Sequence, residues 1–103
     1  MNDFYNESSL CYSALNDLYG LYPVVIFEHK ELASLGRMFR DTETYFTIQV
    51  DPYKASLETV HHEYAHIVAI LKDKDPHHNS NHEQYMNEIK QYCVAKGEKF
   101  YDA

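Results

Sequence analysis

The sequence predicts a single α+β domain over residues 1–103, with an N-terminal helix, a small, mainly antiparallel three-stranded sheet, a second helix, a loop and a C-terminal helix. Three observations lead to this prediction. Apolar residues recur at helical spacing near both ends of the chain and again just after its midpoint. Three short candidate strands, of which the first and last are rich in β-branched and aromatic residues, follow one another with short links, as antiparallel strands do. A chain of 103 residues has room for one hydrophobic core.

The first helix is expected over residues 8–19. Ser8 or Ser9 would be its N-cap, and Gly20 stands where a C-cap glycine usually lies. Its inward face is expected to consist of Leu10, Ala14, Leu15 and Leu18. The three strands are expected at PVVIF (residues 23–27), around residues 37–40, and at YFTIQV (residues 45–50), with the turn DTET before the last one.

Two further helices complete the predicted domain. Asp51 and Pro52 look like an N-cap and a first helical proline, so the second helix is expected from there to about Leu71. The polar segment KDKDPHHNS then forms a loop, and the last helix is expected over about residues 80–96, with its end at Gly97. The buried faces of these two helices are expected to comprise Val60, Tyr64, Ile67, Val68 and Leu71, and then Tyr85, Met86, Ile89 and Cys93.

Composition and charge exclude several classes of protein. Apolar residues make up 45% of the chain, which is typical of a folded domain, and the net charge of -7 argues against direct binding of nucleic acid. Cys11 and Cys93 form no CxxC pair and are expected to be small buried thiols in a reducing compartment. The sequence shows neither a secretory signal nor an apolar run long enough to span a membrane, so a cytoplasmic location without membrane contact is expected.

The segment HEYAH, residues 62–66, carries the strongest functional signal. Residues i and i+4 of a helix lie one above the other, so His62 and His66 can present ring nitrogens to one zinc ion. Glu63 would stand beside the metal, where a carboxylate can take a proton from an activated water. This is the HExxH pattern of zinc metallopeptidases. His61 faces another side of the helix and is expected to take no part.

A catalytic zinc needs a third protein ligand besides these two histidines. The metzincin pattern would place a histidine where the chain has Lys72, which excludes that class. Glu88 of the last helix is one alternative. The segment DPHHNSNHEQYM offers three more, which are His77, His78 and His82. The residues by themselves leave this choice open.

With HEYAH followed by a loop and by PHHNSNHEQYMNEI (residues 76–89), the chain resembles the SprT-like zinc metalloproteases, which include the Spartan proteases. Members carry HExxH on one helix and a third histidine at the start of the final helix, typically as His-Gly-x-x-aromatic. The resemblance implies a zincin-like minimal catalytic domain in which His62, His66 and His78 bind Zn²⁺ and Glu63 is the catalytic residue. The order of elements upstream of the motif agrees with the family over nearly the whole chain.

The chain also departs from the family pattern. Asn79 occupies the position of the family's glycine and His82 that of the aromatic residue, so His82 and His77 remain alternatives to His78. The zinc ribbon and the basic DNA-binding segments that some members carry are not found in this sequence. The resemblance therefore extends to the catalytic domain alone.

The activity implied by the resemblance is zinc-dependent hydrolysis of peptide bonds in protein or peptide substrates. Tyr85, Tyr64, His82 or Arg37 would donate a hydrogen bond to the developing oxyanion. An extended substrate would pair with an edge strand, either YFTIQV or the strand around Met38. Two other interpretations remain, a catalytically silent zinc-binding interaction or inhibitor module of the same fold, and a structural zinc site closed by four protein ligands.

Overall fold

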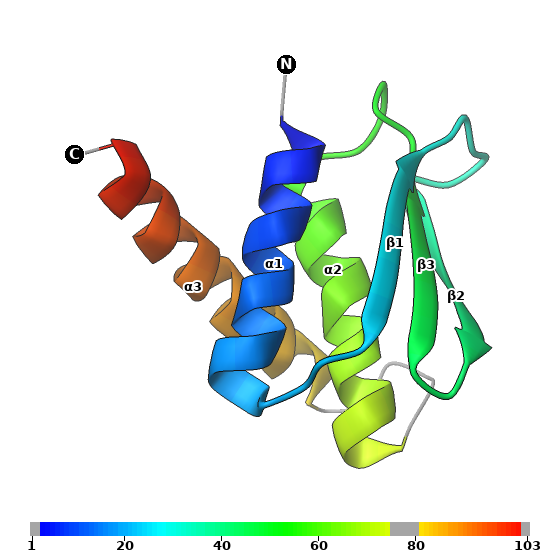
Figure 1. Ribbon diagram of the computed structural model, residues 1–103. Coiled ribbons are helices and arrows are strands. Elements are labelled where there is room, and N and C mark those ends of the chain that lie inside the picture. The colour runs from blue at the N-terminus through cyan, green and yellow to red at the C-terminus, as the bar shows by residue number, and fades with distance from the viewer. Residues whose placement is uncertain (1–2, 75–80, 102–103) are drawn as a thin grey trace.

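The protein folds into three helices and a small sheet, in a computed structural model that describes residues 3–74 and 81–101 (Figure 1). The predicted α+β class and the order of helix, three strands and two helices are confirmed. The elements are α1 (Phe4–Tyr19), β1 (Val24–His29), β2 (Gly36–Thr42), β3 (Tyr45–Val50), α2 (Leu57–Val68), the short π-helix η1 (Ala69–Asp73) and α3 (His82–Tyr101).

The sheet is mixed rather than mainly antiparallel. Its strand order is β1-β3-β2, so the last strand of the sequence lies between the other two. β3 pairs in parallel with β1, where Val24 lies opposite Tyr45, and antiparallel with β2, where Gly36 lies opposite Val50. The alternating Phe46, Ile48 and Val50 of β3 are fully buried, which explains why this strand takes the central place. YFTIQV is therefore not an edge strand, and that expectation was wrong.

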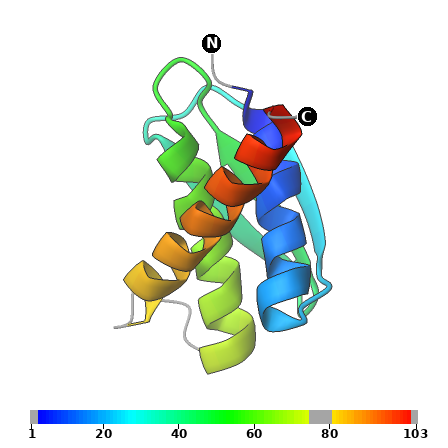
Figure 2. The same ribbon diagram turned by 90° about the vertical axis from the view of Figure 1, so that its left-hand side faces the viewer.

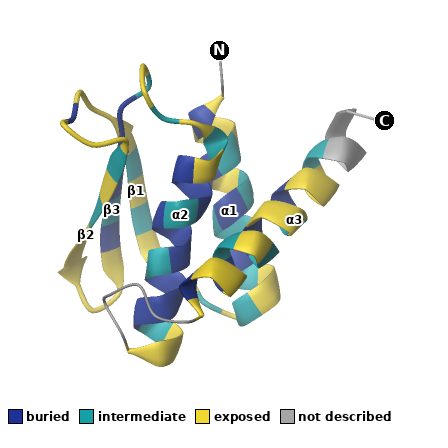
Figure 3. Ribbon diagram, turned by 180° about the vertical axis from the view of Figure 1, so that it is seen from behind, coloured by how far each residue is buried: buried dark blue, intermediate teal, exposed yellow. Residues whose placement is uncertain are grey.

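The helix α2 is the centre of the domain. α1 and α3 pack against it and against each other, while β2 and β3 contact α2 from the side of the sheet (Figures 1 and 2). Most of α2 is consequently buried, in contrast to α3, which shows a long exposed side (Figure 3). The expected inward residues Val60, Tyr64, Ile67 and Val68 are all buried, and only Leu71 is half-exposed.

The start of α1 and the end of α3 differ from those expected. α1 begins at Phe4, because the side chain of Asp3 caps it by accepting a hydrogen bond from the N–H of Asn6 at 2.9 Å. Its other end is at Gly20, which adopts the left-handed conformation (φ 65°) expected of a C-cap glycine. α3 continues through Gly97 to Tyr101. Glycine costs a helix only about 0.5–1 kcal/mol, so the surrounding helix formers carry α3 past it.

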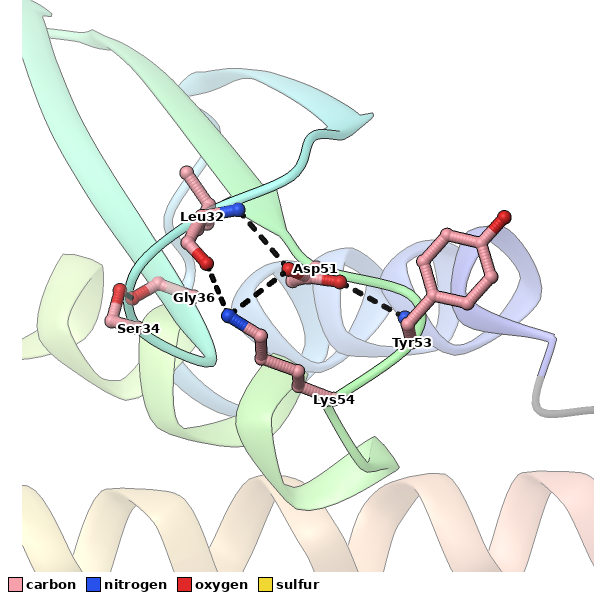
Figure 4. Close-up of polar contacts among 6 residues, drawn as sticks. All are labelled: Leu32, Ser34, Gly36, Asp51, Tyr53 and Lys54. Carbon is pink, nitrogen blue, oxygen red and sulfur yellow. Dashed lines mark hydrogen bonds and ion pairs between the residues drawn. The ribbon is translucent and has the colours of Figure 1, made fainter.

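The second helix starts later than expected, at Leu57 with Ser56 as its N-cap residue. Asp51 instead holds a turn together, with its carboxylate accepting from the N–H of Leu32 at 3.1 Å and of Tyr53 at 3.0 Å (Figure 4). Lys54 Nζ lies 3.6 Å from the same carboxylate and donates to the Leu32 carbonyl. The Leu32 hydrogen bond is the main reason why the pKa of Asp51 is lowered. Asp51 thereby fixes the segment that leads into β2.

The helices that the structure describes are all too short or too polar to cross a bilayer.

Candidate metal centre

His62 and His66 lie on one face of α2, as their spacing predicts. Both are half-buried, and their ring centroids are 4.8 Å apart with the rings nearly perpendicular. The two Nε2 atoms are 3.2 Å apart. Two nitrogen ligands of a tetrahedral zinc ion, each about 2.0–2.1 Å from the metal, stand about 3.3 Å from one another. The pair therefore has the spacing of two zinc ligands.

The third member of this group is His82, the first residue of α3. Its ring centroid is 4.7 Å from that of His62 and 4.3 Å from that of His66. One potential ligand atom from each of the three residues lies within 4.8 Å of the other two. Nε2 of His82 also lies 3.2 Å from the backbone oxygen of His62, which orients the buried ring against α2. We call His62, His66 and His82 the histidine cluster.

The start of α3 is held in place by Asp73 at the end of η1. The Tyr85 hydroxyl lies 3.0 Å from each of the two carboxylate oxygens of Asp73, and the Asn81 amide donates to one of them at 3.2 Å. These contacts fix the residues on either side of His82. The helix that carries His62 and His66 is therefore connected, through η1, to the segment that supplies the third imidazole.

The structure bears differently on each of the residues predicted to bind the metal. His62 and His66 are brought together, and His82, an alternative in the sequence analysis, completes a group of three. His77 and the favoured His78 lie outside the described residues. Glu88 accepts a hydrogen bond from the Tyr19 hydroxyl at 2.6 Å and belongs to neither potential metal-binding group among the residues that the structure describes.

Glu63 lies on α2 beside the histidine cluster and packs against the start of β2. Its side chain is buried, and burial raises its pKa to about 7. A Cβ atom on Gly36 would stand 3.3 Å from Oε2 of Glu63 and 2.8 Å from Cγ2 of Thr59. The glycine therefore permits a close approach of β2 to the carboxylate. A carboxylate with a pKa near neutrality is suited to proton transfer at physiological pH.

A cavity of about 380 Å³ borders His62 and Glu63. It lies between the start of β2, the first half of α2 and α3, and its lining residues are Leu35, Gly36, Ser56, Glu58, Thr59, His62, Glu63 and Met86. A larger cavity of about 590 Å³ lies between α1 and β1 and is lined by none of the clustered histidines. A ligand in the smaller cavity would meet one member of the histidine cluster, His62, together with Glu63.

The four residues considered as oxyanion donors have different surroundings. Tyr64 is a core residue, and its hydroxyl lies 2.7 Å from that of Ser8 on α1. Nε of Arg37 donates to Gln49 at 2.7 Å, and its guanidinium stacks on Phe39. The other two are Tyr85, bound to Asp73, and His82 of the histidine cluster. Of the four, only His82 belongs to the cluster.

His61 has a more definite place than its sequence suggested. Its ring is buried, and Nε2 lies 2.6 Å from Oε2 of Glu7 on α1. As expected, His61 is not part of the histidine cluster. Cys11 and Cys93 are buried as predicted, but they lie beside His61 and beside each other. No sequence signal indicated this group, since its members come from three helices far apart in the chain.

Comparisons of the chain with protein-family models, with curated proteins and with solved structures found no match.

Proposed function

We propose that the protein is a cytoplasmic zinc metallopeptidase of the SprT-like kind, with His62, His66 and His82 as metal ligands and Glu63 as the catalytic base. One observation carries the proposal. Three imidazoles converge, and one of them, His62, lines a cavity together with the buried carboxylate of Glu63. Imidazole nitrogen is a preferred ligand of Zn²⁺, and three protein ligands are typical of a catalytic zinc site.

The chain's own residues have distinct tasks in this proposal. Zn²⁺, when bound, supplies Lewis acidity that polarises the scissile carbonyl and acidifies a water molecule. Glu63 would accept a proton from the attacking water at its carboxylate and deliver it to the nitrogen of the leaving amine. Burial raises the pKa of Glu63 in the metal-free protein, and a raised pKa makes the protonated carboxyl group a better donor to the leaving amine. Because the same proton is taken up and given away, the carboxylate is regenerated in each turnover.

The proposed substrate is an extended segment of a protein. β2 is an edge strand, and its first residue, Gly36, packs against Glu63. A peptide that added itself to the free edge of β2 would gain main-chain hydrogen bonds and could pass the cavity at Glu63. This position favours the strand around Met38 over YFTIQV as the substrate-binding strand. The net charge of -7 disfavours nucleic acid as a direct partner.

The test begins with zinc content per chain in protein that has never met a chelator. Wild type and single alanine variants at His62, His66, His77, His78 and His82 are compared by elemental analysis. The same samples are then incubated with an unfolded protein, and new amino termini are counted. We expect the zinc ion of the histidine cluster and the cleavage activity to be lost together in the variants at His62, His66 and His82 and to persist in those at His77 and His78.

The alternative outcomes are equally definite. Loss of zinc at position 78 with retention at position 82 would assign the third ligand to His78 instead. Zinc that depends on His62 and His66, in protein that shows no cleavage, would identify a silent zinc-binding module. A cobalt-substituted sample with a closed shell of four protein ligands would indicate a structural site. If the variants at His62 and His66 contain as much zinc per chain as the wild type, the proposal is refuted.

A further inference from the structure

A second group of potential metal ligands lies at the junction of the three helices. Cys11 of α1, His61 of α2 and Cys93 of α3 are all at least nine-tenths buried. The two Sγ atoms are 3.6 Å apart, and one potential ligand atom of each residue lies within 4.8 Å of the other two. The proposed function makes no use of these residues. We call them the cysteine cluster.

The hydrogen bonding of His61 is that of a metal-binding histidine. Nε2 lies 2.6 Å from the Glu7 carboxylate, which can only accept a hydrogen bond when ionised, so Nε2 carries a proton and donates. Nδ1 is buried and makes no hydrogen bond of ordinary geometry within the described part of the chain, and its polar neighbour is the Cys93 thiol. Metal-binding histidines commonly donate one ring N–H to a carboxylate and ligate the metal with the other nitrogen. An unpartnered polar atom in a protein core also requires an explanation.

We propose that the cysteine cluster binds a second zinc ion, with Cys11 Sγ, Cys93 Sγ and His61 Nδ1 as ligands. Two sulfur ligands of a tetrahedral zinc, each about 2.3 Å from the metal, stand about 3.8 Å apart, close to the 3.6 Å observed here. Binding releases the two thiol protons to solvent, and the two thiolates then neutralise the charge of Zn²⁺ inside the core. Glu7 orients His61 and is the carboxylate in contact with the cluster.

Two simpler interpretations explain fewer of these observations. Buried thiols that only fill space would account for the cysteines but would leave Nδ1 of His61 with no more than a weak contact to the Cys93 thiol. A disulfide would require the sulfur atoms to approach from 3.6 Å to about 2.05 Å, and it would leave the same nitrogen without a partner. A zinc ion satisfies all three side chains. The ion would join α1, α2 and α3, and its ligand on α2, His61, directly precedes His62 in the sequence.

The test uses the full chain loaded with Co²⁺ in place of zinc, because thiolate-to-cobalt charge transfer gives near-ultraviolet bands that imidazole ligands do not. We expect wild type to bind about two metal ions per chain and to show these bands. His66→Ala should bind one and keep the bands, whereas Cys93→Ser should bind one and lose them. Glu7→Gln should weaken binding at the cysteine cluster by roughly 10- to 100-fold and leave the histidine cluster unchanged.

Wild-type protein alone also decides the matter, should the cysteine variants fail to fold. Zinc should slow the reaction of the two thiols with a small thiol reagent by roughly tenfold or more, since a bound thiolate is shielded. Cobalt-loaded wild type without thiolate bands, thiols that react equally fast with and without zinc, or a mass two hydrogens lower from a Cys11–Cys93 disulfide would each overturn the proposal. If the histidine cluster binds no metal, the thiolate bands and the thiol reaction rates still report on the cysteine cluster. The two proposals are therefore tested separately.

Discussion

His61 and His62 are consecutive residues of α2, yet they belong to opposite environments. His62 is half-exposed, borders a cavity and lies 3.2 Å from Nε2 of His66. His61 is 3% exposed and meets Glu7 of α1 at 2.6 Å, with two thiols from α1 and α3 close by. One step along the helix, a rotation of about 100°, separates the two sites.

The comparison shows how environment assigns different chemistry to the same side chain. Zinc sites that act on substrates keep a side open to solvent, whereas structural zinc sites are closed by protein ligands. The histidine cluster borders a cavity beside a carboxylate, and the cysteine cluster is enclosed by three helices. We therefore expect changes at the histidine cluster to affect activity and changes at the cysteine cluster to affect stability.

The largest expected effect is that of Glu63→Gln on activity. The amide keeps the shape of the side chain but cannot take a proton from water, so turnover should fall by roughly 10²- to 10⁴-fold. Zinc at the histidine cluster should be unchanged, because Glu63 is not one of its proposed ligands. Elemental analysis and a count of new amino termini check both statements. Undiminished turnover in this variant would rule out Glu63 as the base.

The second prediction separates the two neighbouring histidines by their effect on stability in metal-free protein. His61→Leu should lower the free energy of unfolding by about 2–3 kcal/mol, because the Glu7 carboxylate loses its partner in a largely buried place. His62→Leu, at a half-exposed position, should change it by less than about 1 kcal/mol. Urea denaturation in the presence of a chelator gives both values. Equal losses would mean that the two environments do not differ in the way described.

The third prediction concerns the close approach of β2 to Glu63. A methyl group at position 36 would lie 2.8 Å from Cγ2 of Thr59 and 3.2 Å from the Gln49 carbonyl oxygen. Gly36→Ala should therefore cost about 1–3 kcal/mol of stability and lower turnover by displacing Glu63. Its control is Gly97→Ala, where the added carbon meets no described atom within 4 Å beyond its own helix turn, and where helix propensity predicts a gain of about 0.5–1 kcal/mol. Thermal unfolding and turnover of both variants provide the measurement.

The smallest expected effect is the pH dependence contributed by Asp51. Hydrogen bonds from Leu32 first, then from Tyr53, with the charge of Lys54, lower the pKa of Asp51 from its ordinary value of 3.8. A lowered native-state pKa means that the ionised carboxylate stabilises the fold above pH 3.8 and that this stability is lost as the pH falls through the lower native value. Asp51→Asn should thus lower the melting temperature at pH 7 and have little effect near pH 2. A decrease in melting temperature of the same size at pH 2 and pH 7 would contradict a stabilising role of the ionised carboxylate.

Much of the domain follows from local patterns in the sequence. The apolar period of α2 predicts the burial of Val60, Tyr64, Ile67 and Val68, and Gly20 ends α1 in the left-handed conformation expected of it. The four-residue spacing in HEYAH places His62 and His66 on one helical face, which the structure confirms. These properties depend on backbone geometry over a few residues, so they can be predicted without knowledge of the rest of the chain.

Other features depend on which segments meet in space, and only the tertiary structure decided them. β3, whose Phe46, Ile48 and Val50 are fully buried, lies between β1 and β2 and pairs in parallel with β1. Asp51 was expected to cap a helix, but its carboxylate accepts a hydrogen bond from the N–H of Leu32, which lies 19 residues earlier in the sequence. Its short polar side chain suits either role, and local sequence contains no information about the distant partner.

The two clusters show the same division. HEYAH by itself determined that the protein has a pair of histidines spaced for one metal ion. The choice of His82 as their neighbour depended on the contacts of Asp73 with Tyr85 and Asn81, which set the start of α3. The meeting of Cys11 with Cys93, 82 residues apart, depended on the packing of the two terminal helices. Helical spacing is a property of the chain, whereas the contacts between helices result from burying their apolar faces together, and those contacts decided which side chains share a site.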